Sequence, residues 1–264
     1  MPQLTKLFPG FHNKLKILNR LDKYVSGGIV VGREAEFGRM VQQSYLDETQ
    51  KNMITKRYLG IIGIPDTIVD IEKWIKSLEN ESFKLDKNFR GTITKDLEIL
   101  NRDYDESSPT TRFIKKVDAT TNIKILLQLK KRASSTLASK YPQLYKDKTL
   151  VPMILETVTG RKNQLRDHVL QTFGISLLND DNFAQFKLYS AGPKHHGEKI
   201  KTLINSTIFK SNQIGLHAGY VKVSTNKGLI MPLSEADQEL WSPFLDRNGD
   251  FGSLLTRDLK NRIK

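Results

Sequence analysis

The sequence predicts a single α+β domain, and three observations support this prediction. The chain has 264 residues, a length that suits one or two domains, and no linker divides it into two convincing halves. Apolar runs typical of strands and amphipathic stretches typical of helices follow one another without the strict alternation of a doubly wound sheet. No internal repeat or low-complexity tract is visible.

The first part of the chain predicts two strands, two helices and one irregular segment. Residues 29–31 follow two glycines and form a short apolar run, so we expect a strand there, and residues 58–64 predict a second strand. Residues 33–46 carry apolar side chains at helical spacing and predict a helix, and residues 68–78 predict another. Residues 80–112 are polar and rich in turn formers, which predicts an insertion or mobile excursion.

The second part of the chain predicts two more strands, a third helix and a hairpin. Residues 123–129 and 151–158 are apolar enough for buried strands. Residues 219–223 and 228–232 are separated by a short turn and predict a hairpin. Residues 162–173 predict a helix that a glycine closes, and its apolar stripe comprises Leu165, Val169 and Phe173.

The composition excludes several kinds of protein. Hydrophobic residues make up 38% of the chain, enough for one core, and no apolar stretch approaches the roughly 18 residues of a membrane span. The absence of cysteine excludes disulfide scaffolds, thiolate metal sites and cysteine nucleophiles. None of the five histidines has the spacing of a metal site, and no phosphate-binding glycine motif is present. We therefore expect no metal, no nucleotide cofactor and no membrane partner.

The charge of the chain indicates a polyanionic partner. The formal net charge is +13, but residues 66–106 hold eleven acidic and seven basic residues, so the rest of the chain carries +17. Because an acidic surface repels phosphate, we expect a nucleic-acid footprint outside this segment. Basic residues cluster at 115–116, 130–132 and 253–264, although each cluster by itself could be a solvated face.

Four short motifs occur in a fixed order along the chain. They are Arg20-Leu21-Asp22 with Ser26-Gly27 four residues on, Lys56-Arg57-Tyr58, Thr159-Gly160-Arg161-Lys162-Asn163-Gln164-Leu165-Arg166-Asp167-His168, and Leu216-His217-Ala218. The first is uninformative by itself, whereas the third is specific. Together, over residues 20–218, they resemble the RluA-type pseudouridine synthases, and Asn179-Asp180 near Phe183 resembles a further stretch of that family.

The resemblance implies a fold and an activity. It implies one catalytic domain over residues 1–264, with a mixed, mainly antiparallel sheet flanked by helices and a central cleft. The expected reaction detaches the base of an RNA uridine from its ribose, turns it and rejoins it through carbon, without a cofactor. Relative to the family, we expect residues 66–112 to be a variable insertion, the N-terminal strand region to be truncated and the small S4 RNA-binding domain to be absent.

The resemblance assigns the catalytic carboxylate to Asp22. A carboxylate can attack the ribose, or accept a proton from it, as the glycosidic bond breaks. Arg166 is assigned as its ion-pair partner, because a guanidinium can keep a carboxylate ionised in a closed pocket. Tyr58 is assigned as the residue that stacks on the uracil. Without the motifs, we would interpret Asp22 as a turn residue, Arg166 as a surface arginine that binds phosphate and Tyr58 as a core tyrosine.

The resemblance also assigns substrate-binding residues, which are Arg20, Arg161, Gln164 and Leu216. Arg161 is expected on the RNA backbone, and Leu216 is expected as an apolar wall of the pocket. The chain departs from the family pattern at three positions near these motifs, Asn19, Val25 and Asn163, where the family has histidine, threonine and histidine. These departures leave the assigned residues in place.

The expected partner is RNA, with rRNA as the first candidate and tRNA as the second, bound by a monomer. Residues 1–21 hold four basic residues and no acidic one, as targeting segments do, which predicts a mitochondrial location with the cytoplasm as the alternative. The alternative function is a non-catalytic RNA-binding or ribosome-assembly protein on the same fold. Substitution of Asp22 separates the two functions, because only an enzyme loses an activity while it keeps its affinity for RNA.

Overall fold

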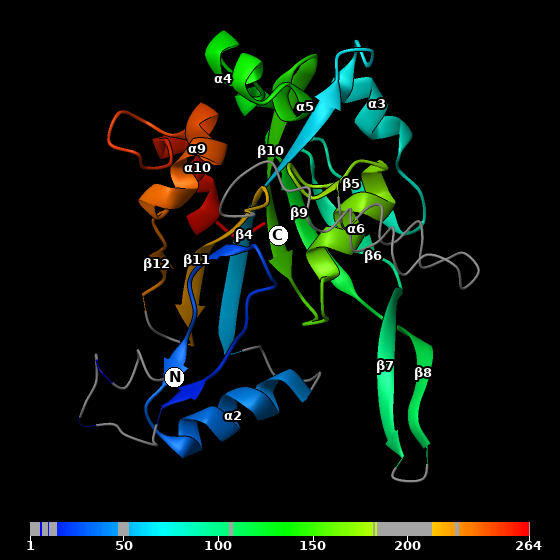
Figure 1. Cartoon of the computed structure of the whole chain (residues 1–264), viewed down its shortest axis with the longest axis vertical. Coiled ribbons are helices and arrows are strands. Elements are labelled where there is room, and N and C mark those ends of the chain that lie inside the picture. The colour runs from blue at the N-terminus through cyan, green and yellow to red at the C-terminus, as the bar shows by residue number, and fades with distance from the viewer. Residues whose placement is uncertain are drawn as a thin grey trace.

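The computed structural model describes residues 15–46, 53–105, 108–181, 213–224 and 227–263, together with positions 6, 10 and 183. Within these residues the chain forms one sheet of eight strands and two separate two-stranded sheets, and helices pack on both faces of the large sheet (Figure 1). The prediction of an α+β fold is confirmed. The expectations about the N-terminal segment concern positions that lie mostly outside the described residues.

The large sheet consists almost entirely of antiparallel pairs. In spatial order its strands are β12 (Leu229–Ile230), β11 (Leu216–Val223), β4 (Ile54–Pro65), β10 (Lys148–Thr157), β9 (Thr120–Ile125), β6 (Arg90–Thr94) and β5 (Phe83–Leu85), and the short β2 (Ser26–Gly27) pairs with β11. Of these pairs, β2 with β11 is parallel and the others are antiparallel. The sheet is therefore mixed and mainly antiparallel, as the resemblance implied.

The alternation of side chains along β4 supplies two hydrophobic cores, one on each face of the sheet. Tyr58 and Ile62 belong to the first core, whereas Leu59 and Ile61 belong to the second, because successive strand residues point to opposite faces. Helices α3 (Ile71–Ser77) and α6 (Gln164–Phe173) cover the first core, and α4 (Ser135–Lys140), α5 (Pro142–Tyr145), α9 (Gln238–Trp241) and α10 (Ser253–Lys260) cover the second (Figure 1). A strand buried on both faces explains the almost continuous apolar run of the sequence.

Helix α6 has the apolar stripe that the sequence predicts and begins two residues later than expected. Leu165, Val169 and Phe173 are at most 5% exposed and pack on the first core. The helix ends at Gly174, whose φ of +64° is the left-handed conformation that favours glycine at this position. Because this stripe faces the sheet, Arg166, the residue after Leu165, points away from the first core.

The segment 80–112 is more regular than predicted. Strands β5 and β6 extend the large sheet, and β7 (Leu97–Asp105) and β8 (Ser108–Val117) form a long separate hairpin (Figure 1). Phe83, Ile93 and Leu97 are fully buried. Single apolar residues among polar ones suffice for strands with one buried face, so the polar composition concealed these strands. The segment therefore contains strands that its turn-rich sequence did not indicate, and its interpretation as an insertion stays a prediction.

Smaller differences concern the ends of elements. Strand β9 ends before the predicted limit of 129, because Leu127–Leu129 forms a 3₁₀ turn, η2. The strand expected at 29–31 is β3 (Val31–Gly32), which pairs with β1 (Lys16–Ile17), and the helix expected at 33–46 is α2 (Ala35–Leu46). Two further 3₁₀ turns, η3 (Glu235–Asp237) and η4 (Ser242–Phe244), flank α9. The hairpin of β11 and β12 is confirmed. Among the described helices, none has the length and apolar character that a membrane span requires.

Candidate active site

Asp22 lies in a tight turn between β1 and β2. The amide of Val25 donates to the carbonyl oxygen of Asp22 at 3.1 Å, and Tyr24 has a left-handed φ of +73°, so the chain reverses direction within four residues. Asp22 is half-exposed, and its carboxylate forms no ion pair with any residue that the structure describes. The backbone of the turn, rather than a side-chain partner, therefore places this carboxylate.

Strand β11 holds the C-terminal side of this turn. Ser26 lies opposite His217 and Gly27 opposite Ala218, and the amide of Gly28 donates to the carbonyl of Ala218 at 3.1 Å. Gly27 has a φ of +119°, and a Cβ there would collide with the backbone of Ala218. The glycine of the first motif is thus required for a close approach of two backbones. The first and fourth motifs meet here.

The third motif attaches α6 to strand β9 through Gln164. Its amide nitrogen donates to the carbonyl of Thr120 at 2.8 Å and to the hydroxyl of Thr121 at 2.9 Å. Its amide oxygen accepts from the hydroxyl of Thr159 at 2.8 Å and from the amide of Arg161 at 3.0 Å. Gln164 is 2% exposed, and internal bonds occupy both ends of its amide. These bonds anchor α6 to β9, and the expected substrate contact of Gln164 stays a prediction.

His168 provides a second attachment one helical turn further on. Its Nδ1 lies 2.9 Å from the hydroxyl oxygen of Thr121, and its Nε2 lies 3.1 Å from the carbonyl oxygen of Lys95. Burial lowers the pKa of His168, and the bond to the Lys95 carbonyl opposes this shift. A neutral ring that donates from Nε2 and accepts at Nδ1 satisfies both contacts. The histidine of the third motif therefore joins α6 to the root of the β7–β8 hairpin.

Arg166 forms a bidentate ion pair with Asp180. Its Nε donates to Oδ2 at 2.8 Å and its Nη2 to Oδ1 at 2.7 Å, while Nη1 donates to Oδ1 of Asn163 at 3.2 Å. The guanidinium also lies over the ring of Phe183, 4.1 Å from the ring centre. The side chains of Arg166 and Asp180 are only 11% and 3% exposed. In the structure Asp180, rather than Asp22, occupies the Nε edge of the guanidinium, and a contact of Arg166 with Asp22 stays a prediction.

Asp22 interacts electrostatically with groups on both sides of the turn. Burial raises the pKa of Asp180, the Arg166 guanidinium opposes this rise, and the carboxylates of Asp181 and Asp22 add to it. On the other side, burial lowers the pKa of Lys56 on β4, and the negative charge of Asp22 opposes this shift. The Asp22 carboxylate is thus within electrostatic reach of Lys56 on the sheet and of Asp180, the partner of Arg166.

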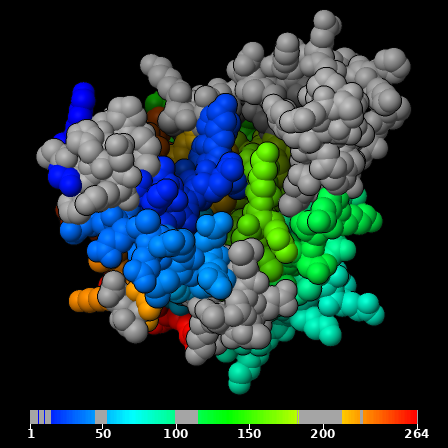
Figure 2. Space-filling model, turned by 90° about the horizontal axis from the view of Figure 1, so that it is seen from below, coloured from blue at the N-terminus to red at the C-terminus, as the bar shows by residue number. Residues whose placement is uncertain are grey.

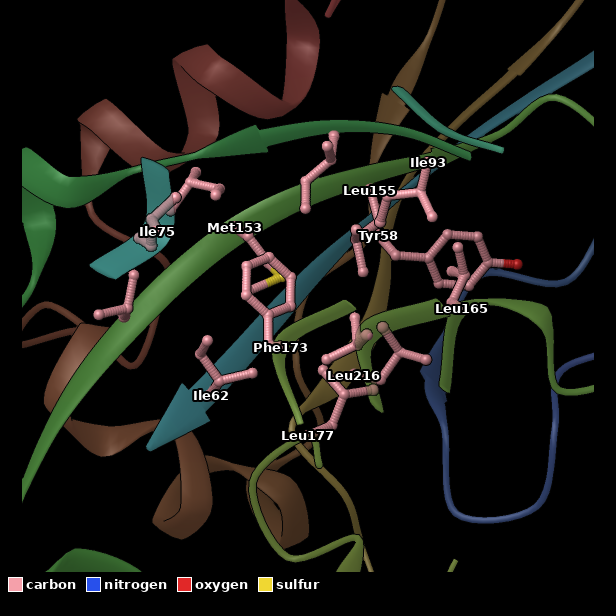
Figure 3. Packing of buried hydrophobic residues seen from close by; sticks show 14 of the residues in the cluster. Tyr58, Ile62, Ile75, Ile93, Met153, Leu155, Leu165, Phe173, Leu177 and Leu216 are labelled. Atoms are coloured by element: carbon pink, nitrogen blue, oxygen red, sulfur yellow. The ribbon is translucent and has the colours of Figure 1, made fainter. Parts of the chain in front are cut away.

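Tyr58 and Leu216 belong to the apolar cluster beneath the turn. Tyr58 is 7% exposed and Leu216 is 2% exposed, and Figure 3 shows the ring of Tyr58 beside Leu165. Three side chains of the turn region, Leu21, Tyr24 and Val25, pack against the same cluster. Tyr58 therefore occupies the core position considered as its alternative, at the base of the Asp22 turn.

The two arginines that were assigned to RNA contacts are both exposed. Arg20 lies just before the Asp22 turn. Arg161 donates from Nε to the carbonyl of Asp118 at 3.1 Å. This bond uses neither of the two outer nitrogens of its guanidinium. Exposed guanidinium groups at these places suit phosphate contacts beside the turn and beside α6.

The surface is hollowed beside these residues. Figure 2 shows a hollow between the N-terminal segment, coloured blue, and α6, coloured yellow-green, which corresponds to the predicted cleft. A cavity of about 450 Å³ adjoins the other flank of the Asp22 turn, and it is lined by Leu21, Val25, Ser26, Gly27, Met231, Pro232, Ser234 and Asp237. In the described part of the chain, no group of three or more potential metal-binding side chains gathers at one place.

The fold and this arrangement of side chains define an RNA-modifying enzyme of one family. The model of the RNA pseudouridylate synthase family matches residues 4–171, and the chain belongs to this family. A solved structure, Human RNA Pseudouridylate Synthase Domain Containing 4, shares the fold with a TM-score of 0.50 at 18% sequence identity, over 92% of this chain and 80% of that chain. The protein is an RNA pseudouridine synthase, and the resemblance of its four motifs to this family is confirmed.

Similar proteins are known in fungi. The 21S rRNA pseudouridine(2819) synthase of Candida albicans is 33% identical over 244 residues, which cover 90% of this chain and 85% of that protein. The protein of the same name in Eremothecium gossypii is 21% identical and covers 98% of this chain and 72% of its own length. The similarity thus extends well beyond the four motifs.

Sequence reasoning left three residues of the site without a role. Lys56 was quoted in a motif, and its spacing of two from Tyr58 on a strand could have indicated that both lie on one face of β4. Asp180 was noted in a family-like stretch, yet no sequence signal connects it with Arg166. His217 was quoted in the fourth motif, and its attachment to Ser26 depends on a strand pairing that bridges 191 residues.

Proposed function

We propose that this enzyme converts one uridine of the mitochondrial large-subunit rRNA into pseudouridine, and that it acts as a monomer in mitochondria. The observation that carries the proposal is the 33% identity, over 90% of the chain, to a protein named for 21S rRNA. The net charge of +13 suits a polyanionic substrate. The basic N-terminal segment, with four basic residues and no acidic one among residues 1–21, supports a mitochondrial location.

Asp22 is proposed as the catalytic carboxylate. Isomerisation breaks the bond between N1 of the uracil and C1′ of the ribose, forms a bond between C5 and C1′, releases the C5 proton to water and adds a proton from water to N1. A carboxylate that is half-exposed and has no ion-pair partner among the described residues can attack the ribose or accept a proton from it. Its position at the tip of a turn beside the hollow allows a flipped nucleotide to reach it.

Arg166 is proposed as the fixed cation that faces the reacting nucleotide. A guanidinium has five N–H donors, and the bonds to Asp180 and Asn163 engage three of its nitrogens with one donor each. Two N–H donors on the outer nitrogens remain for the substrate or for the Asp22 carboxylate. Because its orientation is fixed before RNA binds, this cation can stabilise developing negative charge without reorganisation.

Tyr58 and Leu216 are proposed as the apolar floor of the uracil pocket. A base can meet the ring of Tyr58 once one of the covering side chains, Leu21, Tyr24 or Val25, rotates away. Arg20 and Arg161 are proposed to bind phosphates on the two sides of the hollow, which would help to offset the cost of unstacking the target nucleotide.

Tritium release from RNA that contains 5-tritiated uridine tests this proposal. Wild type and Asp22→Asn are incubated with transcripts of mitochondrial large-subunit rRNA and, separately, with tRNA transcripts. The proposal predicts that wild type releases tritium from the rRNA alone, and that Asp22→Asn binds the same RNA without release. The matched control is Asp96→Asn, which removes an exposed carboxylate outside the site and should release tritium like wild type.

The outcomes separate the parts of the proposal. Release from tRNA alone would contradict the rRNA target while leaving the role of Asp22 intact. Release by Asp22→Asn at the wild-type rate would contradict its catalytic role.

A further inference from the structure

A buried histidine that the proposed chemistry does not use lies beneath the Asp22 turn. His217 on β11 is fully buried, and the centre of its ring lies 5.3 Å from that of Phe251 and 6.2 Å from that of Trp241. Its Nδ1 is 2.9 Å from the hydroxyl oxygen of Ser26, and its Nε2 is 2.9 Å from the carbonyl oxygen of Met231. The ring therefore joins β2, β11 and the segment that follows β12.

The chemistry of these partners fixes the direction of both bonds. A carbonyl oxygen accepts only, so Nε2 carries the hydrogen and donates it to Met231. In a neutral ring Nδ1 then accepts, so the single hydroxyl hydrogen of Ser26 goes to it, while the amide nitrogen of Gln213 donates to the Ser26 oxygen at 3.1 Å. Burial lowers the pKa of His217, and the bond to the Met231 carbonyl and the charge of Asp237 oppose this shift. A neutral ring is the form that can accept from Ser26.

Ser26 follows Asp22 by four residues, and its hydroxyl has a second partner besides His217, the side-chain amide of Gln213 at 3.1 Å. The turn's own bond runs from the Val25 amide to the Asp22 carbonyl, and the carbonyl of Tyr24 accepts from the amide of Ile214 at 3.1 Å. Since the Asp22 carboxylate has no ion-pair partner among the described residues, any movement of β2 along β11 moves the carboxylate with it. A misplacement of about 1 Å can cost roughly 100-fold in rate.

We infer that His217 positions the catalytic turn through its hydrogen bond with Ser26. The inference rests on the proposed catalytic role of Asp22 and adds two positioning residues, neither of which touches the reacting atoms. The bond of Nδ1 to Ser26 serves catalysis, whereas the bond of Nε2 to Met231 serves packing of the C-terminal segment. The two nitrogens of one ring thus have separable functions.

Two substitutions of similar size separate these functions. His217→Asn places an amide near the position of Nδ1 and can keep the bond with Ser26 while it loses the bond with Met231. His217→Gln places its amide near the position of Nε2 and can keep the bond with Met231 while it loses the bond with Ser26. Ser26→Ala removes the first bond from the other side, and Ser242→Ala is the control, because Ser242 is exposed and its hydroxyl bonds only within its own helix region.

The expected result is a split between rate and affinity, measured by single-turnover tritium release and RNA binding. Ser26→Ala and His217→Gln should lower the single-turnover rate about 10- to 100-fold, with the dissociation constant of RNA within about twofold of wild type. His217→Asn should recover most of the rate, to within about threefold of wild type, although it loses the bond with Met231 and lowers the melting temperature more than His217→Gln does. Ser26→Ala removes the bond with His217 and also the contact with Gln213, whereas His217→Gln removes only the first. The double variant should therefore be no slower than Ser26→Ala alone.

Three results would overturn the inference. They are a wild-type rate in Ser26→Ala, equal rates in the two His217 variants, and losses that add in the double variant. If a His217 variant fails to fold, Ser26→Ala decides alone. Asp22→Asn in the same assay distinguishes the two proposals: an inactive Asp22→Asn beside a fully active Ser26→Ala rejects only the positioning role, whereas an active Asp22→Asn rejects the catalytic role itself.

Discussion

The two sides of the proposed active site are held in opposite ways. On the α6 side, Gln164, His168 and Arg166 all have buried partners, and the guanidinium of Arg166 is clamped by Asp180. On the other side, the carboxylate of Asp22 has no ion pair among the described residues, and it lies on a turn whose neighbouring residues, rather than Asp22 itself, are attached to the sheet. In the proposed mechanism the cation is therefore in place before RNA binds, and the RNA supplies the partner of the carboxylate.

The two sides therefore differ in how much their side chains contribute to the stability of the fold. A buried guanidinium needs a negatively charged partner, and Asp180 provides it for Arg166. The Asp180 carboxylate is itself buried, and this burial raises its pKa. Leaving the carboxylate without a partner keeps it available as a nucleophile or base. Substitutions of Arg166 or its partners should therefore affect both the free energy of unfolding and the reaction rate. Substitution of Asp22 should affect the reaction rate alone.

The largest combined effect is expected from Asp180→Ala. It leaves the guanidinium of Arg166 buried without its partner, which typically lowers the free energy of unfolding by about 3–5 kcal/mol, and it lets the side chain swing away from the site. Urea denaturation and single-turnover tritium release measure the two effects. Asp181→Ala, which removes the exposed neighbouring carboxylate, is the matched control and should change either quantity little. An Asp180→Ala variant with wild-type rate would remove the contrast between the two sides.

Gln164→Ala should be the next largest, with its main effect on stability. It removes the acceptor of the Arg161 amide and the bonds that join α6 to Thr120 and Thr121, although the carbonyl of Thr120 keeps the bond from the amide of Val158 at 3.0 Å. A polar group left without its partner costs about 1–3 kcal/mol. The exposed Gln171 on the same helix provides the control Gln171→Ala. If Gln164→Ala instead weakens RNA binding at unchanged stability, the positioning role is wrong and the substrate contact first expected is right.

A moderate effect is expected from acid, because His168 and His217 both have lowered pKa values in the folded chain. In the unfolded chain they bind protons near pH 6.5, so between pH 6.5 and the lower folded values the unfolded state holds more protons. The stabilising contribution of the two neutral rings should be fully present above about pH 6.5, and the free energy of unfolding should fall as the pH decreases below that value. Urea denaturation at about pH 7.5 and pH 5.5 checks this, and His168→Gln should flatten the dependence. A free energy of unfolding that is higher at about pH 5.5 than at about pH 7.5 would contradict the buried neutral state of both rings.

The smallest effect is expected from Arg161→Ala. Its guanidinium is exposed and its proposed partner is a phosphate, so RNA affinity should weaken for all sequences alike, and the slope of log affinity against log salt should fall by about one. Titration at several salt concentrations measures this slope. A change that depends on the RNA sequence would indicate a base contact instead.

The sequence indicated the fold better than the partners within the site. The alternation of Tyr58 and Leu59, the stripe of α6 and the glycine that ends it follow local rules, and the structure confirms them. The polar segment 80–112 was misjudged, because a strand with one buried face needs few apolar residues. Local rules describe neighbours along the chain, which is why they sufficed for these elements.

The partner of Arg166 could not be predicted in this way. Asp22 and Asp180 are both carboxylates beside the same helix in space, and no spacing in the sequence states which one reaches the Nε edge of the guanidinium. The attachment of Ser26 to His217 likewise arises from a parallel strand pair that no local pattern encodes. The motifs located the right segments, and tertiary packing decided which side chains meet.

The structure of Asp22→Asn bound to its RNA substrate tests the central contrast most directly. We expect Arg166 to remain paired with Asp180 through Nε and Nη2. We also expect the side chain at position 22 to lie against the ribose of a uridine flipped into the hollow. Two results would contradict this arrangement. In the first, Arg166 leaves Asp180 and binds a phosphate. In the second, the flipped uridine lies away from the side chain at position 22.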